Sequence, residues 1–148
     1  MRIAHLPVMA AAALMTFGAG LSALTAQPRA PATAPLVSLS ERDLSATRES
    51  GCECSFNIGR RTLARVIGNE LTIRTGAGRQ VCRISDAQFS ALSDGRGNAI
   101  CGGVRLSLRR TGPVRAMPES DSADWRAALT VAQGRMRRTL AGRWGCAC

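Results

Sequence analysis

Lysine, tyrosine and histidine are absent or nearly absent from this chain. It has no lysine and no tyrosine, and its one histidine is His5. His5 lies in an apolar N-terminal segment that we expect to be cleaved off, which would leave no side chain that normally changes charge near neutral pH. Ser/His/Asp triads, Cys/His pairs and zinc sites with histidine ligands would then be excluded. We therefore expect a protein that is not an enzyme and needs no cofactor.

Aromatic residues are also scarce, at 3% of the sequence. After the N-terminal segment they are Phe56, Phe89, Trp125 and Trp144. Proteins that bind single-stranded nucleic acid stack the bases on exposed aromatic rings. So few candidate rings, together with the expected export, predict that nucleic acid is not the partner.

The N-terminal segment has the layout of a secretory signal peptide. Arg2 precedes an uncharged, alanine-rich run from Leu6 to Ala26. We expect cleavage after Ala26, with Ala23 as an alternative site, so that residues 1–26 are the signal peptide and the mature protein is periplasmic or secreted. An uncleaved anchor is the alternative, since the run approaches the roughly 20 apolar residues that span a bilayer, but proline and glycine interrupt it. After cleavage we expect no transmembrane segment.

The remaining chain divides into a linker and one domain. Residues 27–50 are rich in proline, serine and other small residues, and we expect a flexible linker there, with a candidate helical turn at Ser40 to Thr47. Cysteines, glycines and alternating apolar residues first occur together at Gly51. Residues 51–148 should therefore form a single β domain, long enough for one core and too short for two.

The domain sequence favours antiparallel strands. Thr62–Ile67 and Glu70–Thr75 flank Gly68-Asn69, which is typical of a hairpin whose turn needs glycine at positive φ. Val104 to Arg109 alternates aliphatic and polar residues with the period of a strand. A capping-box pattern at Ser85 and Gln88 predicts a short helix over 85–92. Further strands are expected at 79–84, 127–132, 135–141 and 143–148, with turns at Gly134 and Gly142 and a long mobile loop at 111–124.

These elements predict an all-β fold. We expect a small antiparallel barrel or sandwich of about seven or eight short strands, with one short helix, and the strand count does not separate the two architectures. We expect disulfide bonds to cross-link this domain.

The six cysteines are the most informative residues, because an even number in an exported chain is typical of a disulfide framework. Side chains two residues apart in a strand share a face, so each C-x-C motif presents both sulfurs on one side. Antiparallel pairing of the first and last strands would set the two motifs opposite each other in register. The predicted bonds are Cys52–Cys148, Cys54–Cys146 and Cys82–Cys101, the last one stapling the helix between two strands. The swapped pairing of the two motifs would require parallel or staggered ends.

A four-thiolate metal site formed by Cys52, Cys54, Cys146 and Cys148 is the alternative, since Cu(I) and Zn(II) bind thiolates well. It requires reduced cysteines, which an oxidising compartment disfavours. A thiol-redox role for the C-terminal motif is a further alternative, although Trp144 and Gly145 are typical of packing and turn residues in a last strand.

Arginine supplies the whole basic charge of the expected mature chain. Removing Arg2 with the signal peptide leaves 19 arginines and 10 acidic residues, a net charge of about +9. Guanidinium groups suit carboxylate and phosphate, so an anionic envelope component or an acidic protein is the expected partner of an exported, noncatalytic binding or structural module. The candidate anion-binding residues are Arg60, Arg61, Arg65, Arg74, Arg79, Arg83, Arg105, Arg109 and Arg110.

An enzyme that uses a pair of carboxylates is another alternative, because two carboxylates can perform acid–base catalysis without histidine. The candidates are Glu53, Glu70, Asp86 and Asp94. No spacing among them indicates a shared cleft, and three of them also suit positions beside a turn or at the start of a helix or loop.

Overall fold

The structure of the chain, a computed structural model, describes residues 36–46 and 49–148. The predicted signal peptide and the first part of the predicted linker lie outside the described residues. Within the described ranges, no helix is both long and apolar enough to cross a membrane. Most of the domain is antiparallel strand, as the alternating sequence predicts.

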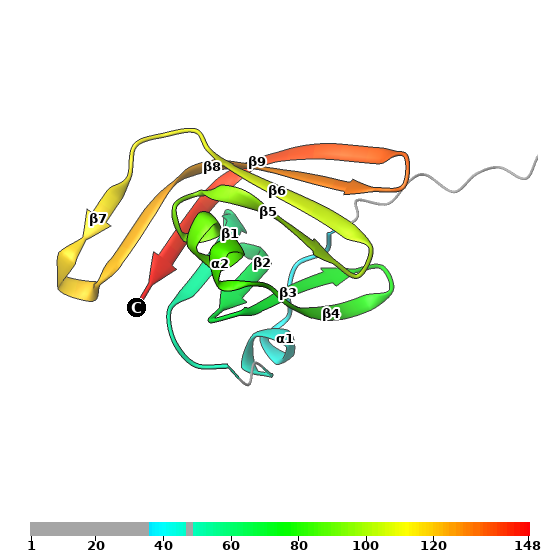
Figure 1. Cartoon of the computed structure of the whole chain (residues 1–148), viewed down its shortest axis with the longest axis horizontal. Helices are drawn as coiled ribbons and strands as arrows, with labels where there is room; N and C mark the ends of the chain where they lie inside the picture. The colour runs from blue at the N-terminus through cyan, green and yellow to red at the C-terminus, as the bar shows by residue number, and fades with distance from the viewer. Residues whose placement is uncertain (1–35, 47–48) are drawn as a thin grey trace, which may run out of the picture.

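Eight strands form one antiparallel sheet that curls into a nearly closed barrel (Figure 1). Its strand order is β4-β3-β2-β1-β9-β8-β6-β5. One half is a meander of β1 (Glu53–Ile58), β2 (Arg61–Ile67), β3 (Glu70–Thr75) and β4 (Gly78–Arg83). The other half contains β5 (Arg96–Cys101), β6 (Val104–Arg110), β8 (Ser122–Gln133) and β9 (Met136–Ala147). Of the two architectures that the sequence left open, the chain forms the barrel.

The first and last strands lie side by side and join the two halves. β1 and β9 are antiparallel, and Cys54 stands directly opposite Cys146. Disulfide bonds link Cys54 to Cys146 and Cys52 to Cys148, with Cα–Cα distances of 4.0 and 4.2 Å. These are the two pairs that the register argument predicts.

The barrel has a seam between its two edge strands, β4 and β5, which do not pair with each other. Helix α2 (Asp86–Ser93) connects them, and Cys82 on β4 is bonded to Cys101 on β5, with a Cα–Cα distance of 5.5 Å. The helix begins with the expected capping box: the Gln88 backbone N–H donates to the Ser85 hydroxyl, and the Ser85 N–H donates to the Gln88 side chain. The predicted helix is thus confirmed, and its disulfide spans the seam.

The barrel interior holds most of the aromatic side chains of the domain. Phe56 on β1 stands opposite Trp144 on β9, and Trp144 stands opposite Trp125 on β8. Their exposed fractions are 0%, 2% and 4%. The three rings form a row across the core, surrounded by aliphatic side chains such as Val66 and Val131.

Two local predictions were wrong. Gly142 is not a turn, because β9 runs through it without a break. A Cβ at this position would lie 2.5 Å from the Asn57 carbonyl oxygen and 2.7 Å from the Phe56 ring, so glycine is needed for close packing. The segment 111–124 is not one long loop either: it contains β7 (Arg115–Met117), which pairs with β8, and the short 3₁₀ helix η1 (Pro118–Ser120).

The packed unit also begins before Gly51. Leu36 and Leu39 are each 7% exposed, and Leu36 belongs to the hydrophobic core. Helix α1 (Glu41–Ser45) follows, with a capping box at Ser40, which confirms the candidate helical turn. The described part of the predicted flexible linker is therefore packed on the barrel, because its two leucines bury apolar surface there.

Candidate anion-binding cleft

Three of the nine candidate arginines already have carboxylate partners. The pairs are Arg65–Glu53, Arg74–Asp43 and Arg83–Glu49, with N–O distances of 2.8, 2.8 and 2.9 Å. The first joins β2 to β1, and the other two hold the chain that precedes β1 against β3 and β4. These three arginines contribute to the fold, and their charges are partly neutralised.

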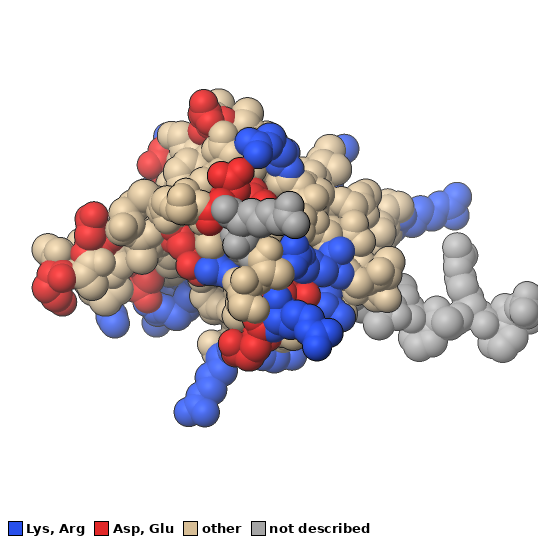
Figure 2. All heavy atoms as spheres, turned by 90° about the horizontal axis from the view of Figure 1, so that it is seen from below, with Lys and Arg blue, Asp and Glu red and all other residues tan. Residues whose placement is uncertain are grey.

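The other six candidates do not form one patch. Arg60 lies in the turn between β1 and β2, and Arg61 is the first residue of β2. Arg79 lies on β4, and Arg105 is the first outward-facing residue of β6. Figure 2 shows basic side chains at the end of the molecule that holds the β8–β9 hairpin and acidic ones at the opposite end, near η1. Only Arg109 and Arg110, at the end of β6, line a depression together with a further arginine that the sequence did not single out.

Four arginines form a row on the outer face of the barrel, one on each of four adjacent strands. Arg96 on β5 stands directly opposite Arg109 on β6, and Arg126 on β8 stands directly opposite Arg143 on β9. Arg109 faces Ala128, two residues from Arg126 and on the same face. The two members of each opposed pair are therefore about 5 Å apart across their strands, and Arg109 and Arg126 are diagonal neighbours about 7 to 8 Å apart. We call Arg96, Arg109, Arg126 and Arg143 the arginine row.

Acidic residues accompany only the two ends of this row. Arg96 Nη2 lies 3.8 Å from Asp94 Oδ2, and Arg143 Nε donates to Asp124 Oδ2 at 2.8 Å. Arg109 and Arg126, in the middle, have no ion pair or side-chain hydrogen bond with any residue of the described chain. Like charges placed opposite each other on neighbouring strands repel. Anionic groups would therefore lower the electrostatic energy most beside Arg109 and beside Arg126.

Two adjoining depressions open beside the row. The first, of about 620 Å³, is lined by Arg96, Arg109 and Arg110 together with Asp94. The second, of about 510 Å³, is lined by Arg115, Arg126 and Arg143. Val114 and Trp125 line both. We call the two depressions together the arginine cleft, to which β5, β6, β7, β8 and β9 each contribute at least one arginine.

Trp125 lies where the two depressions meet. Its indole N–H is buried and has no hydrogen-bond acceptor among the described residues, which costs about 1 to 3 kcal/mol for a buried donor. Gly95 packs against the ring: a Cβ there would lie 2.5 Å from Trp125 Nε1 and 2.8 Å from Cε2. Gly95 also has a φ of +76°, which favours glycine. The backbone of this turn can therefore approach the indole only because it carries no side chain.

Comparisons with protein-family models, with curated proteins and with solved structures find no match. The function of the cleft must therefore be argued from its own geometry and charge.

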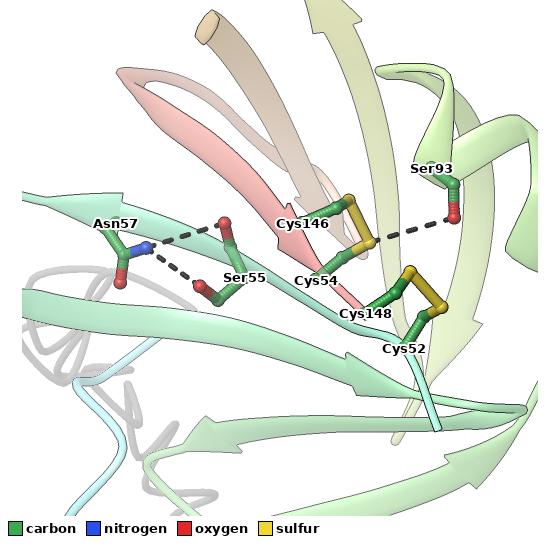
Figure 3. The surroundings of a disulfide bond; sticks show 7 residues. All are labelled: Cys52, Cys54, Ser55, Asn57, Ser93, Cys146 and Cys148. Atoms are coloured by element: carbon green, nitrogen blue, oxygen red, sulfur yellow. Dashed lines mark hydrogen bonds between the residues drawn. A yellow bond between two sulfur atoms is a disulfide. The ribbon is translucent and has the colours of Figure 1, made fainter. Parts of the chain in front are cut away.

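A disulfide supports the turn that carries Asp94 and Gly95. Helix α2 ends at Ser93, whose hydroxyl oxygen lies 3.7 Å from the Cys54 sulfur (Figure 3). The Arg110 backbone N–H donates to the Gly95 carbonyl oxygen at 2.7 Å. The bonds from Cys54 and from Cys52 to the C-terminal motif lie next to each other in Figure 3. The cleft is thus built on a cross-linked part of the barrel, which limits the side-chain and loop ordering that binding would require.

All six cysteines are present as disulfides, so the two C-x-C motifs offer no thiolate in this structure. Among the described residues there is also no group of three or more histidine, cysteine, aspartate or glutamate side chains that could hold a metal ion. The three bonds are those predicted from the sequence for a disulfide framework.

The four candidate carboxylates occupy separate positions. Glu53 is paired with Arg65, Asp86 accepts a hydrogen bond from the Asn69 side chain, and Asp94 lies near Arg96 at the edge of the cleft. Glu70 begins β3, and one of its carboxylate oxygens is buried without a partner in the described chain. These positions give no geometric support to a two-carboxylate active site.

Two of the six cleft arginines, Arg109 and Arg110, were predicted from the sequence. The other four were missed: Arg96, Arg115, Arg126 and Arg143. A local pattern was available for two of them. Arg126 follows Trp125 and Arg143 precedes Trp144, so each arginine lies beside a buried tryptophan on the opposite face of its strand. What the sequence does not contain directly is the strand register that brings them into one row.

Proposed function

We propose that this chain is an exported, noncatalytic binding module that captures an anionic ligand in the arginine cleft. The single observation that supports this most is the arginine row, whose two middle guanidiniums have no acidic partner in the described chain. Unpaired like charges on adjacent strands are unfavourable in the free protein, so they favour a ligand that brings the opposite charge.

The chemistry of the cleft limits the class of ligand. Guanidinium groups bind carboxylate and phosphate oxygens with two parallel hydrogen bonds, and such charge-assisted bonds are stronger than neutral ones. The proposed partner is an anionic envelope component or an acidic protein that presents such oxygens.

Export is part of the proposal. Three disulfides are typical of proteins that fold in an oxidising compartment, and the N-terminal sequence has the layout of a signal peptide. Expressing the full chain and sequencing the N-terminus of the accumulated protein tests this. A mature chain that starts after Ala26 or Ala23 in the periplasm or medium supports export, and an uncleaved cytoplasmic chain contradicts it.

Binding is tested by NMR titration of the disulfide-bonded chain with long-chain inorganic polyphosphate at two salt concentrations. We expect saturable shifts in β5, β6, β8 and β9 and in the Trp125 indole N–H. The variant Arg109→Gln/Arg126→Gln should bind at least tenfold more weakly, since hydrogen bonds to charged groups contribute about 1.5 to 3 kcal/mol each. The matched control Arg135→Gln/Arg137→Gln removes two exposed arginines at the tip of the β8–β9 hairpin and should change the affinity much less.

Equal losses in the two variants would mean that only overall charge matters, and would contradict a site at the row. Absence of saturable binding would favour a purely structural role for the domain.

A further inference from the structure

We infer that the ligand of the arginine cleft carries two anionic groups about 12 Å apart, one for each depression. This inference rests on the proposed function and specifies the ligand more narrowly. It follows from how charge, shape and strand register divide the cleft.

The two halves have the same charge. In the first, Asp94 offsets one of the three arginines Arg96, Arg109 and Arg110. In the second, Asp124 pairs with Arg143 and stands opposite Arg115 in the register of β7 and β8. Arg126 completes that half. Each half is therefore left with two uncompensated positive charges, which suits one phosphate or one or two carboxylates.

The shape of the cleft also divides it into two. The depressions have similar volumes, about 620 and 510 Å³, and they share only Val114 and Trp125. Val114 is 47% exposed, whereas Trp125 is buried. The apolar side chains of Val114 and Trp125 therefore separate the cleft into two basic depressions.

The register sets the distance between the two charged ends. One opposed pair, Arg96 and Arg109, lies on β5 and β6, and the other, Arg126 and Arg143, lies on β8 and β9. The midpoints of the two pairs are two strand spacings apart, about 10 Å, and are offset by two residues, about 7 Å, along the strands, which makes a separation of about 12 Å. Because arginine side chains are long, the bound groups need not match this value closely.

A ligand with one charged group would neutralise only one pair and leave the other two guanidiniums opposed. Once one end of a two-ended ligand is bound, the other end is held close to the second half, which raises its effective concentration. The cleft should therefore discriminate by ligand length, with a clear threshold.

Calorimetric titration of the unmodified chain with two series of anions tests this. One series is orthophosphate and linear polyphosphates of increasing length, and the other is galacturonate and its linear oligomers. In at least one series we expect weak binding of the short members and a rise of on the order of 100-fold once the extended ligand reaches about 12 Å. Nonspecific attraction would instead increase smoothly with the number of charges.

Variants in each half test whether the length threshold requires both depressions. Arg110→Gln acts on the first depression and Arg115→Gln on the second, and each should abolish the threshold while short anions still bind the intact half. The matched control Arg135→Gln changes the charge equally outside the cleft and should keep the threshold.

Smooth length dependence in both series, with binding still weakened by Arg109→Gln/Arg126→Gln, would overturn the two-group inference and leave the anion site standing. No saturable binding by either series would instead overturn the proposed function itself. Because the length series needs no variant, a variant that fails to fold does not remove the test.

Discussion

At the scale of single residues, the backbone at Gly95 determines how the cleft is built. The residue has a φ of +76°, and its missing side chain leaves room for the Trp125 ring. Any added side chain makes this φ unfavourable and brings a Cβ into the space of the ring. The turn that carries Asp94 would then have to move away from the tryptophan.

We predict that Gly95→Ala destabilises the protein by about 2 to 4 kcal/mol, from the positive φ and from the clash together. Gly103→Ala is the matched control, because Gly103 has a φ of +75° but nothing within 4 Å of its added Cβ. It should cost only about 1 to 2 kcal/mol. Urea denaturation followed by tryptophan fluorescence measures both. Equal losses would mean that the Trp125 contact contributes nothing.

Only part of the cleft could be predicted from single residues. The sequence shows that arginines are numerous and that Arg109 and Arg110 lie at the end of the alternating segment of β6. The position of Arg96 opposite Arg109 could not be predicted, because it depends on the register of β5 against β6. Arg65 and Arg74 were predicted as anion sites, yet their partners Glu53 and Asp43 lie 12 and 31 residues earlier in the chain.

At the scale of elements, the segment before β1 is the clearest departure from the sequence prediction. The composition of this segment indicates a linker. Leu36 and Leu39 are nevertheless buried, because the barrel offers them an apolar surface that the composition of the segment does not reveal. Asp43 of α1 adds a polar anchor. It is 5% exposed, accepts hydrogen bonds from the Ser40 backbone N–H and hydroxyl, and pairs with the Arg74 guanidinium.

These contacts predict a pH dependence. The hydrogen bond from the Ser40 backbone N–H lowers the pKa of the Asp43 carboxyl, the Ser40 hydroxyl and Arg74 lower it further, and burial opposes them. A pKa that is lower in the folded than in the unfolded chain stabilises the fold above the ordinary aspartate value of 3.8. That contribution is lost as the pH falls through the folded-state pKa.

We therefore expect Asp43→Asn to destabilise the protein by about 1.5 to 3 kcal/mol at neutral pH and by less in acid. Denaturant unfolding of both chains across this pH range measures the difference. Glu119→Gln, at the exposed η1 turn, serves as the control and should show no such convergence. A difference between Asp43→Asn and the unmodified chain that stays constant down to acid pH would contradict the role of the carboxylate charge.

Other elements were predictable because their determinants are local. The capping box of α2 and the alternation in β6 require only neighbouring residues. β7 was missed because three residues carry almost no periodicity, and the strand exists through its pairing with β8.

At the scale of the whole molecule, the order of the strands explains what each disulfide does. Cys52–Cys148 and Cys54–Cys146 join strands that are already hydrogen-bonded neighbours. Cys82–Cys101 joins the two edges of the sheet, where no ladder exists. The cysteine spacing gave the pairs, but it could not distinguish a barrel from a sandwich, because closure depends on which strands lie at the edges.

Removing the seam disulfide should therefore affect the barrel more than removing one terminal bond. Cys82→Ser/Cys101→Ser opens a loop with a sequence separation of 19 and should cost about 3 kcal/mol, with faster amide exchange in β4 and β5. Cys52→Ser/Cys148→Ser should cost under about 1 kcal/mol, because Cys54–Cys146 still closes nearly the same loop. Denaturation and hydrogen-exchange mass spectrometry compare the two. If both double variants lose equal stability, or if exchange rises evenly over all strands, then the Cys82–Cys101 bond does not hold the seam, and the edges β4 and β5 must be closed by α2 and the core alone.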